Sequence, residues 1–548
     1  MSYKILLFLF LAVGCSGAQK GGEDDIFIRV NQAGFKPGDI KTAIVFTDSD
    51  LSDIKFFIID KIADAPVFTD RIKKLNTKFG DFKFSYEIDF TDVKDEGKYY
   101  IKIKDSVSPQ FSINNKVYYG LTADLLKFFS VQRCGYTEPF MHKVCHIADV
   151  TSIRIGADTL KKTHDATGGW HDAGDYGKFL NTTAFSTYML LASYEFAPEK
   201  FCMDNNNNNV SDLLEEAKIG LDWLLRADYE NKAFITQVQD EKDKTVGWRM
   251  PSADPLGFNR PGFVGIGKNL IGVYVAALSI GSRIWDKTLR YKSYSDRLKE
   301  TAIHFYAMKD DVPDIDSSGT GYYRDADFNG KLALAAIELY QTTGESNYLD
   351  DAKKYAKIAG AESWWGWGNM AAFADYKIAR YDSSFTDLLR KSLEHYKEHS
   401  EKRTFGEGVD LYWGSNMTLL GVSLTNLLYK RLTGDNSFAK LARIHEDYVL
   451  GRNQWGVSFI CCHGERYAAH LHHQIGFFNN GKLPGGFAGG PVMKSVYGNL
   501  ELKYKTLDSF LKFQTKDAYY RDDFVDYITN EPTISGNATA IFVFGNLK

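Results

Sequence analysis

Cysteine, net charge and long apolar runs are scarce in this sequence, and each scarcity excludes a class of protein. The 548 residues include six cysteines. Five of them follow Cys15, and this odd number argues against a complete disulfide framework. The 66 basic and 70 acidic side chains give a net charge of -4 without a long basic run, which argues against a nucleic-acid partner. No stretch beyond the N-terminus is long and apolar enough to span a membrane.

The sequence does have the composition of a globular protein, with many aromatic residues. Hydrophobic residues make up 44% of the chain and charged residues 25%, which excludes a disordered chain or a collagen-like repeat. Phe, Trp and Tyr together reach 14%, with 32 tyrosines and 9 tryptophans. Flat side chains in this number suit stacking on a ligand such as a sugar ring, although an aromatic-rich core gives the same composition.

The N-terminus has the layout of a bacterial export signal. An apolar run over 5–13 is too short to span a bilayer and is followed by small residues. The segment 12–15, Ala-Val-Gly-Cys, resembles a lipobox. We therefore predict a lipoprotein signal peptide over 1–14 and a lipidated Cys15, whose acyl chains anchor the protein to a membrane. The alternative is a plain secretory signal with an incidental cysteine.

A polar linker is predicted over 15–26. Its acidic segment 23–25 resembles the surface-export signals of some Gram-negative lipoproteins. This resemblance predicts a lipid-anchored outer-membrane protein that is exposed on the cell surface. The alternative interpretation is that these acidic residues only solvate the linker.

The hydrophobic pattern divides the rest of the chain into two regions. Between 27 and 116, short alternating or β-rich runs are separated by turn residues, which predicts a small all-β sandwich. From 117 to 548 the hydrophobic period changes to 3.6 residues, which predicts a helical domain. Its amphipathic segments lie near 119–131, 180–196, 211–227, 267–286, 291–308, 330–342, 346–359, 367–380, 383–400, 414–432, 435–450 and 536–547.

These twelve segments suggest either a helical solenoid or a closed barrel of six helical hairpins. Long loops rich in glycine, proline and aromatic residues interrupt the pattern at 134–179, 244–266, 309–329 and 461–533. Long ordered loops on a helical scaffold usually carry function. The asparagine run 205–209 is predicted to be a solvated loop.

Two carboxylates three residues apart mark the first chemical segment. Asp172 and Asp175 lie on the glycine-rich turn 168–179. Such a pair can orient one water molecule and remove its proton, which is the role of a general base. A Ca²⁺ loop or a turn with helix-capping aspartates has the same spacing.

Two further segments lie near the C-terminus. In 520–531, Glu531 follows several acidic and aromatic residues, and an apolar setting would raise its pKa and suit a general acid; an exposed charged loop is the alternative. In 461–474, four of the twelve histidines cluster. Their spacing matches no compact zinc pattern, and imidazoles also hydrogen-bond sugar hydroxyls.

Together these motifs resemble glycoside hydrolase family 9, whose members are mainly inverting endo-β-1,4-glucanases. The resemblance rests on the segments 169–175, 413–416, 450–453, 458–459, 472–473, 530–531 and 537–538. The segment 30–35, Val-Asn-Gln-Ala-Gly-Phe, resembles the start of the immunoglobulin-like domain that precedes many of these catalytic modules. The resemblance implies an (α/α)6 barrel, with an open cleft across one end, behind an immunoglobulin-like β-sandwich.

The resemblance also implies roles for individual residues. Asp175 matches the general base, Asp172 its partner on the water, and Glu531 the general acid. Asp522 matches an acidic position that supports the acid loop, and His472 a substrate-binding histidine. One departure is Gln474, which stands where the family usually has arginine, so a neutral amide replaces a guanidinium with five N–H donors.

A structural zinc site and sugar-binding aromatic residues complete the implied site. The implied zinc ligands are Cys134, Cys145, His146 and His171, with a Cys134–Cys145 disulfide as the alternative. Calcium is a further candidate cofactor. The expected sugar-stacking residues are Trp365, Trp367, Trp413 and Tyr527.

The function predicted from the sequence is inverting endo-hydrolysis of a soluble β-1,4-glucan by a monomeric enzyme. Xyloglucan or mixed-linkage β-glucan is favoured over cellulose because no second tryptophan-rich module is present to hold crystalline polymer. The alternatives are an exo-acting β-glucosidase or glucosaminidase on the same scaffold, and a glycan-binding lipoprotein with an inactive site. Two carboxylates and a distant acid argue against the latter, because binding alone does not need them.

Overall fold

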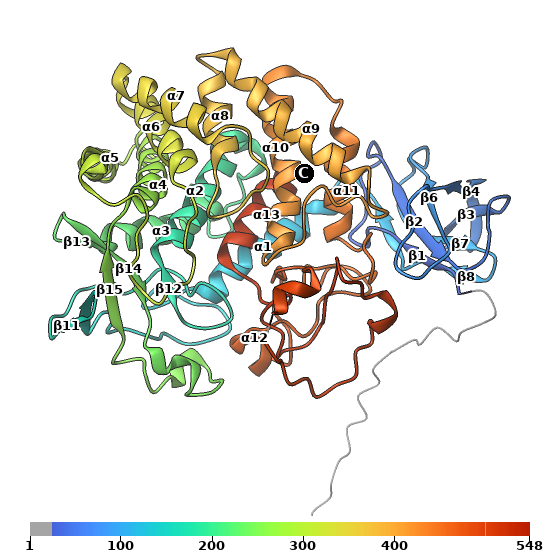
Figure 1. Cartoon of the computed structure of the whole chain (residues 1–548), viewed down its shortest axis with the longest axis horizontal. Coiled ribbons are helices and arrows are strands. Elements are labelled where there is room, and N and C mark those ends of the chain that lie inside the picture. The colour runs from blue at the N-terminus through green and yellow to red at the C-terminus, as the bar shows by residue number, and fades with distance from the viewer. Residues whose placement is uncertain (1–24, 499) are drawn as a thin grey trace, which may run out of the picture.

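In the computed structural model, residues 25–498 and 500–548 are described, and they form a small β domain beside a large helical domain (Figure 1). The predicted signal peptide over 1–14 and the predicted lipidation site Cys15 lie outside the described residues. None of the helices in the described part is both long and apolar enough to cross a membrane.

The β domain is a sandwich of two antiparallel sheets. Its strands are β1 (Phe27–Arg29), β2 (Thr42–Thr47), β3 (Lys55–Asp60), β4 (Ala65–Arg71), β5 (Lys73–Lys74), β6 (Phe84–Asp89), β7 (Gly97–Ile103), β8 (Ser106–Val107) and β9 (Phe111–Ile113). One sheet has the order β1-β2-β6-β5 and the other β4-β3-β7-β8, with β9 also paired to β7. Along β7, Tyr99, Ile101 and Ile103 face the core while Lys98 and Lys102 are exposed. This alternation is what the sequence pattern predicts for a sheet with one solvated face.

Six helices form the inner ring of the helical domain. They are α2 (Leu180–Phe196), α4 (Lys268–Lys287), α6 (Asn329–Thr343), α8 (Ala371–Ala379), α10 (Ser415–Thr433) and α13 (Ile534–Asn546). Each packs against the next, and α13 packs back against α2, so the ring is closed. Most of their residues are buried on every side, which is expected for helices enclosed by other helices.

Six outer helices cover this ring. They are α3 (Asp212–Ala227), α5 (Lys292–Ala307), α7 (Ser346–Ala359), α9 (Thr386–Ser400), α11 (Ala439–Val449) and α1 (Val117–Gln132), packed in this order on α2, α4, α6, α8, α10 and α13. All twelve predicted segments are therefore helices. The predicted (α/α)6 barrel is confirmed and the solenoid is excluded.

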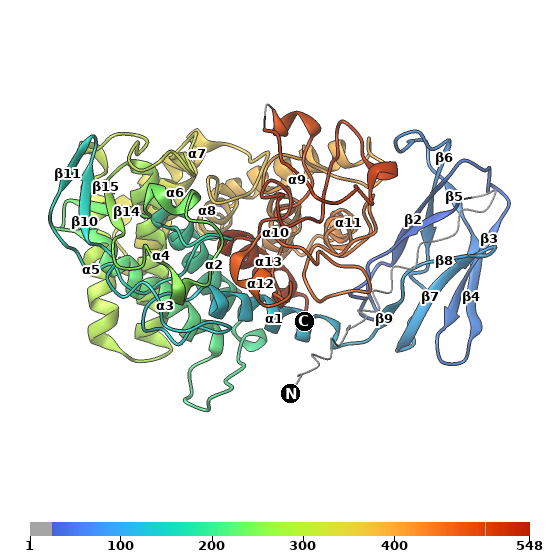
Figure 2. The same cartoon turned by 90° about the horizontal axis from the view of Figure 1, so that it is seen from below.

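Long connections gather where the inner helices begin. The loop before α2 and the loop between α3 and α4 share a small sheet of order β11-β10-β15-β14-β12, with β13 paired to β14. Its strands are β10 (Ser152–Ile155), β11 (Asp158–Leu160), β12 (Lys178–Phe179), β13 (Asp228–Tyr229), β14 (Ala233–Val238) and β15 (Pro261–Gly265). The C-terminal loops, drawn in orange to red in Figure 2, include the short helix α12 (Gln474–Phe478). The first amide of α12 donates to the Gly174 carbonyl in the loop before α2 at 3.1 Å. The chemical segments of the sequence therefore lie at one end of the barrel.

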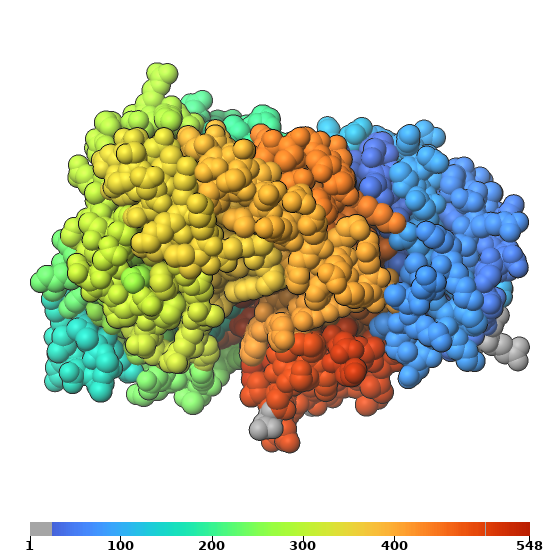
Figure 3. Space-filling model, turned by 45° about the horizontal axis from the view of Figure 1, so that its top comes forward, coloured from blue at the N-terminus to red at the C-terminus, as the bar shows by residue number. Residues whose placement is uncertain are grey.

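The segment 30–35 joins the two domains. Asn31 Nδ2 donates to Asp447 Oδ1 at 2.8 Å, and Gln32 Nε2 donates to the Gly456 carbonyl at 2.8 Å. Asn31 and Gln32 are buried against the barrel. The β domain therefore packs against the side of the barrel formed by the later part of the chain, as the space-filling view shows (Figure 3).

Candidate active site

The loop that carries Asp172 and Asp175 is fixed from two sides. The His171 amide donates to the Gln132 carbonyl at 2.7 Å, and the Ile534 amide donates to the Asp172 carbonyl at 2.9 Å. Gly174 lies so close to the chain at residue 472 that an added Cβ would be 2.0 Å from the His472 oxygen. Only glycine allows this approach, which brings the loop against the C-terminal segments.

Asp172 is buried, and both of its carboxylate oxygens accept hydrogen bonds. Thr182 Oγ1 donates to Oδ1, and the Tyr323 hydroxyl donates to Oδ2. The side chain is 1% exposed. Burial raises the pKa of Asp172 to about 7, although both hydrogen bonds favour its charged form.

Asp175 is partly exposed at the surface of the same loop. Its Oδ1 accepts from the Gly177 amide and its Oδ2 from Gln239 Nε2, both at 3.0 Å. Burial and then the negative charge of Asp243 raise the pKa of Asp175 to about 6. The carboxylate is thus held in place and is mostly ionised at neutral pH.

Glu531 meets this loop from the C-terminal segment. Its Oε1 accepts from the Gly174 amide at 3.1 Å, next to Asp175 in the chain. Burial, followed by the charge of Asp175, raises the pKa of Glu531 well above its usual value. Glu531 therefore keeps its proton to a higher pH than an ordinary glutamate, which suits a general acid.

Several aromatic side chains pack around His472 and its neighbours. Trp248 lies edge-on against His472 with ring centroids 5.0 Å apart, and Tyr527 also lies edge-on against His472 at 5.7 Å. Trp413 is 52% exposed and its ring centroid is 5.8 Å from that of Tyr527. His472 Nδ1 donates to the Phe524 carbonyl at 2.6 Å, which leaves Nε2 free to accept a hydrogen bond.

Sequence profiles identify both domains. The profile described as glycosyl hydrolase family 9 matches residues 118–544, and that of the cellulase N-terminal Ig-like domain matches residues 25–108. The chain belongs to glycosyl hydrolase family 9. The family predicted from the sequence motifs is therefore confirmed, and the protein is a glycoside hydrolase.

Similar proteins cover nearly the whole of this family 9 chain. A xyloglucan-specific endo-β-1,4-glucanase of Bacteroides ovatus is 25% identical over 98% of this chain and 96% of its own. A cellodextrinase of Butyrivibrio fibrisolvens is 26% identical over 95% of this chain and 99% of its own. The solved structure of a metagenome-derived family 9 endoglucanase has a TM-score of 0.81 at 23% identity, and covers 95% of this chain and 99% of that one. This last likeness concerns the fold.

Asp522 lies beside the acid loop of this family 9 enzyme. It accepts hydrogen bonds from the His470 amide at 2.8 Å and from Asn530 Nδ2 at 3.1 Å. Asn530 directly precedes Glu531, so Asp522 holds the segment that carries Glu531.

The structure corrects the prediction that Trp365 stacks on the substrate. Trp365 is fully buried, and its Nε1 donates to Thr539 Oγ1 at 3.2 Å, so no sugar reaches its ring. Trp367 stays partly exposed and packs edge-on against Tyr323 at 5.1 Å. Gln474 is 6% exposed and its Oε1 accepts from the Arg249 amide at 3.0 Å, which leaves only Nε2 available for a sugar.

Sequence reasoning missed four residues that the structure brings to the site. Tyr323 and Thr182 hold Asp172, Gln239 holds Asp175, and Trp248 packs on His472. They come from three separate segments with no shared motif. The available signals are the long loops 244–266 and 309–329, which contain Trp248 and Tyr323.

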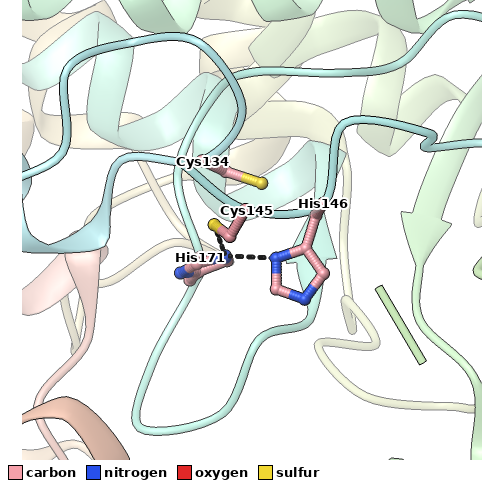
Figure 4. A group of neighbouring side chains, drawn as sticks. All are labelled: Cys134, Cys145, His146 and His171. Atoms are coloured by element: carbon pink, nitrogen blue, oxygen red, sulfur yellow. Dashed lines mark hydrogen bonds between the residues drawn. The ribbon is translucent and has the colours of Figure 1, made fainter. Parts of the chain in front are cut away.

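Cys134, Cys145, His146 and His171 form one buried group (Figure 4). One donor atom from each lies within 4.8 Å of all the others. His171 Nε2 is 3.2 Å from His146 Nδ1 and 3.8 Å from Cys145 Sγ. Both cysteines are free thiols rather than a disulfide, so the four predicted ligands are positioned to share one metal ion.

Proposed function

We propose that this enzyme hydrolyses internal β-1,4-glucosidic bonds of a soluble glucan with inversion at the anomeric carbon. The observation that carries this proposal is the hydrogen bond from the Gly174 amide to Glu531, which brings Glu531 to the loop that carries Asp172 and Asp175. Two acceptors on one side and a protonated acid on the other are the groups that an inverting glycosidase uses.

The proposed reaction assigns one step to each group. Asp175 takes a proton from a water molecule, with Asp172 as the second acceptor, and the water oxygen forms the new bond to the anomeric carbon. Glu531 gives its proton to the glycosidic oxygen as the carbon–oxygen bond breaks. Afterwards the base releases its proton to solvent and the acid takes one up, so the enzyme returns to its starting state.

The exposed aromatic residues support a long, soluble substrate. Trp413 presents half of its surface to solvent, and Trp367, Tyr527 and His472 are partly exposed around the same end of the barrel. Stacking reads only the face of a sugar, so it tolerates side-chain decoration. The similarity to a xyloglucan-specific endoglucanase agrees with xyloglucan or mixed-linkage β-glucan as the substrate. The similarity to a cellodextrinase favours exo-action as the second candidate.

Sizing the products of a polysaccharide panel separates these candidates. We expect xyloglucan or mixed-linkage β-glucan to be cut faster than carboxymethylcellulose, with oligosaccharides released from the start. Release of monosaccharide alone would favour the exo-acting alternative. The absence of product from every glucan would favour a glycan-binding protein with an inactive site.

We propose that the group of two cysteines and two histidines binds structural zinc. Tetrahedral zinc with bonds of about 2.05 Å to nitrogen and about 2.3 Å to sulfur places its ligands about 3.3–3.8 Å apart, and the distances of 3.2 and 3.8 Å in this group agree with that geometry. His146 Nε2 also contacts Asp254 Oδ2 at 3.0 Å, the carboxylate partner that metal-bound histidines usually have. Bound zinc would supply a structural crosslink, and His171 would extend it to its neighbour Asp172.

We also propose that the predicted calcium binds the asparagine-rich loop before α3, for which composition alone predicts only a solvated loop. Residues 204–215 carry Asp, Asn, Asn, Asp and Glu at positions 1, 3, 5, 9 and 12, the ligand spacing of an EF-hand loop. Asn209 stands at the usual glycine position and has φ of 65°. Its amide donates to Asp204 Oδ2 at 2.8 Å, and Glu215 reaches back from α3 to Asn206 Nδ2 at 2.9 Å.

The proposed cellular location rests on the N-terminal sequence. We propose a monomeric, surface-exposed outer-membrane lipoprotein anchored through Cys15, and the apolar run and lipobox-like segment support this. Labelling with a fatty-acid analogue should modify the wild-type protein and not Cys15→Ser. Equal labelling of the two would contradict the anchor.

A further inference from the structure

A lysine ammonium is buried beneath the active site. Lys331, near the start of α6, is 1% exposed. Its Nζ donates to Asp325 Oδ1 at 2.7 Å and to Asn181 Oδ1 at 2.9 Å, and lies 6.0 Å from the ring centroid of Trp367. Burial lowers the pKa of Lys331 while Asp325 opposes this effect. Burying an ammonium group costs free energy unless the group is paired and hydrogen-bonded. Asp325 and Asn181 meet this condition for Lys331.

The partners of Lys331 extend the network to two other elements. Asp325 Oδ2 accepts from Asn269 Nδ2 at 2.6 Å, and Asn269 Oδ1 in turn accepts from the Asp316 amide at 2.9 Å. Asn181 Nδ2 donates to the Tyr323 carbonyl at 3.4 Å. Helices α2, α4 and α6 are thus each tied to the loop 316–325, and the Lys331 ammonium links the α2 and α6 contacts by bonding both Asn181 and Asp325.

The same loop places the phenol of Tyr323. Tyr323 has φ of 53°, a left-handed conformation that non-glycine residues adopt only when their surroundings hold them. Its ring is wedged edge-on between Phe179 and Trp367, with centroids 5.1 Å from each. Its hydroxyl donates to Asp172 Oδ2. The position of this donor therefore depends on a backbone that the Lys331 network fixes.

We propose that Lys331 is a positioning residue, a fixed internal cation that holds Asp325 and Asn181 and through them aims the Tyr323 hydroxyl at Asp172. The proposal rests on the proposed function, in which Asp172 and Asp175 bind the attacking water. It assigns a catalytic consequence to a side chain that touches neither the substrate nor the reacting atoms. Lys331 and Asp325 lie outside the motifs on which the family resemblance rests.

The test compares three variants of the full-length enzyme: Lys331→Met, Lys331→Arg, and the double variant Asp325→Asn with Lys331→Met. Initial rates on a soluble glucan give kcat and KM, and thermal unfolding gives the melting temperature. The double variant removes both charges, so no unpaired charge stays buried if Lys331→Met alone fails to fold.

We expect Lys331→Met and the double variant to lose about 10- to 100-fold in kcat while KM changes by less than about threefold. Lys331→Arg keeps a cation and should restore most of the activity.

Lys377 provides a matched control. It is also a buried lysine on an inner helix, 2% exposed and paired with Glu195 and with Glu338 at 2.6 Å, but it lies toward the C-terminal ends of α2 and α8, away from the site. Lys377→Met should lower the melting temperature and leave kcat and KM unchanged. If the Lys331 variants behave like this control, or keep wild-type kcat, the proposal is overturned.

An inactive wild-type enzyme would refute the proposed function instead. In that case a crystal structure of the double variant decides this inference independently. Displacement of the Tyr323 hydroxyl from Asp172 supports the positioning role, and an intact hydrogen bond overturns it.

Discussion

In the proposed reaction Asp175 must be ionised and Glu531 must be protonated. We expect Asp175→Asn and Glu531→Gln each to lower kcat by about 10²- to 10⁴-fold, because each removes a proton-transfer group without changing side-chain volume. Asp165→Asn, an exposed aspartate on the same long loop, is the control and should keep full activity. Steady-state kinetics with circular dichroism measures this. Activity of Asp175→Asn within tenfold of wild type would exclude Asp175 as the base.

The pKa values of the same two residues predict a bell-shaped pH profile. The base must be ionised, so kcat/KM should fall as the pH drops through about 6, where Asp175 takes up its proton. The acid must be protonated, so activity should fall again at the alkaline pH where Glu531, with its raised pKa, loses its proton. Rates measured from pH 4 to 10 test this. Constant activity down to pH 4 would contradict the assignment.

Single residues also show where sequence reasoning reaches its limit. The three carboxyl groups could be predicted because they lie in short motifs. The role of Tyr323 could not, because its hydroxyl reaches Asp172 from a loop 151 residues away in the chain. Trp365 was predicted wrongly because a tryptophan near a helix end has the same sequence signature whether it faces the cleft or, as here, the core.

The proposed zinc would crosslink the loop from Cys134 to His171. We expect Cys145→Ser to lose zinc, to lower the melting temperature by about 5–10 °C and to reduce activity, because His171 directly precedes Asp172. Cys202→Ser, at an exposed cysteine, is the control. Metal analysis and thermal unfolding are the measurements. Wild-type protein that contains no zinc and a Cys134–Cys145 disulfide would refute the site.

The loop before α3 gives a separate prediction for calcium. Millimolar Ca²⁺ should raise the melting temperature of wild-type protein by about 3 °C or more, because a ligand of the native state alone stabilises it. Glu215→Gln should abolish this rise, and Glu199→Gln, just outside the loop, should keep it. An equal rise in all three proteins would show that calcium binds elsewhere.

The helices themselves were predictable, whereas the loops were not. Each helix carries its own 3.6-residue hydrophobic pattern, so local sequence is enough to find it. The small sheet that joins β10 to β15 in parallel pairs residues about 109 positions apart, such as Ser152 with Pro261. Such pairing depends on the closed barrel and leaves little local signal.

The two domains act as one structural unit around the site. The segment 30–35 is bound by hydrogen bonds to the chain between Asp447 and Gly456, and Gln32 Oε1 also accepts from the Arg466 amide at 2.8 Å. Arg466 lies shortly before His472. The β domain therefore supports the segments that carry the C-terminal half of the site, a relation that neither domain's sequence pattern could show.

The central claim is that the whole chain is an inverting glucanase in which Asp175 and Glu531 act from opposite faces of the sugar. Proton NMR of a fresh xyloglucan hydrolysate, recorded before mutarotation, tests it most directly. Attack by a water molecule opposite the leaving group converts a β-linkage to an α-anomer. We expect the α-anomer signal to appear first, and an initial β-anomer would exclude inversion.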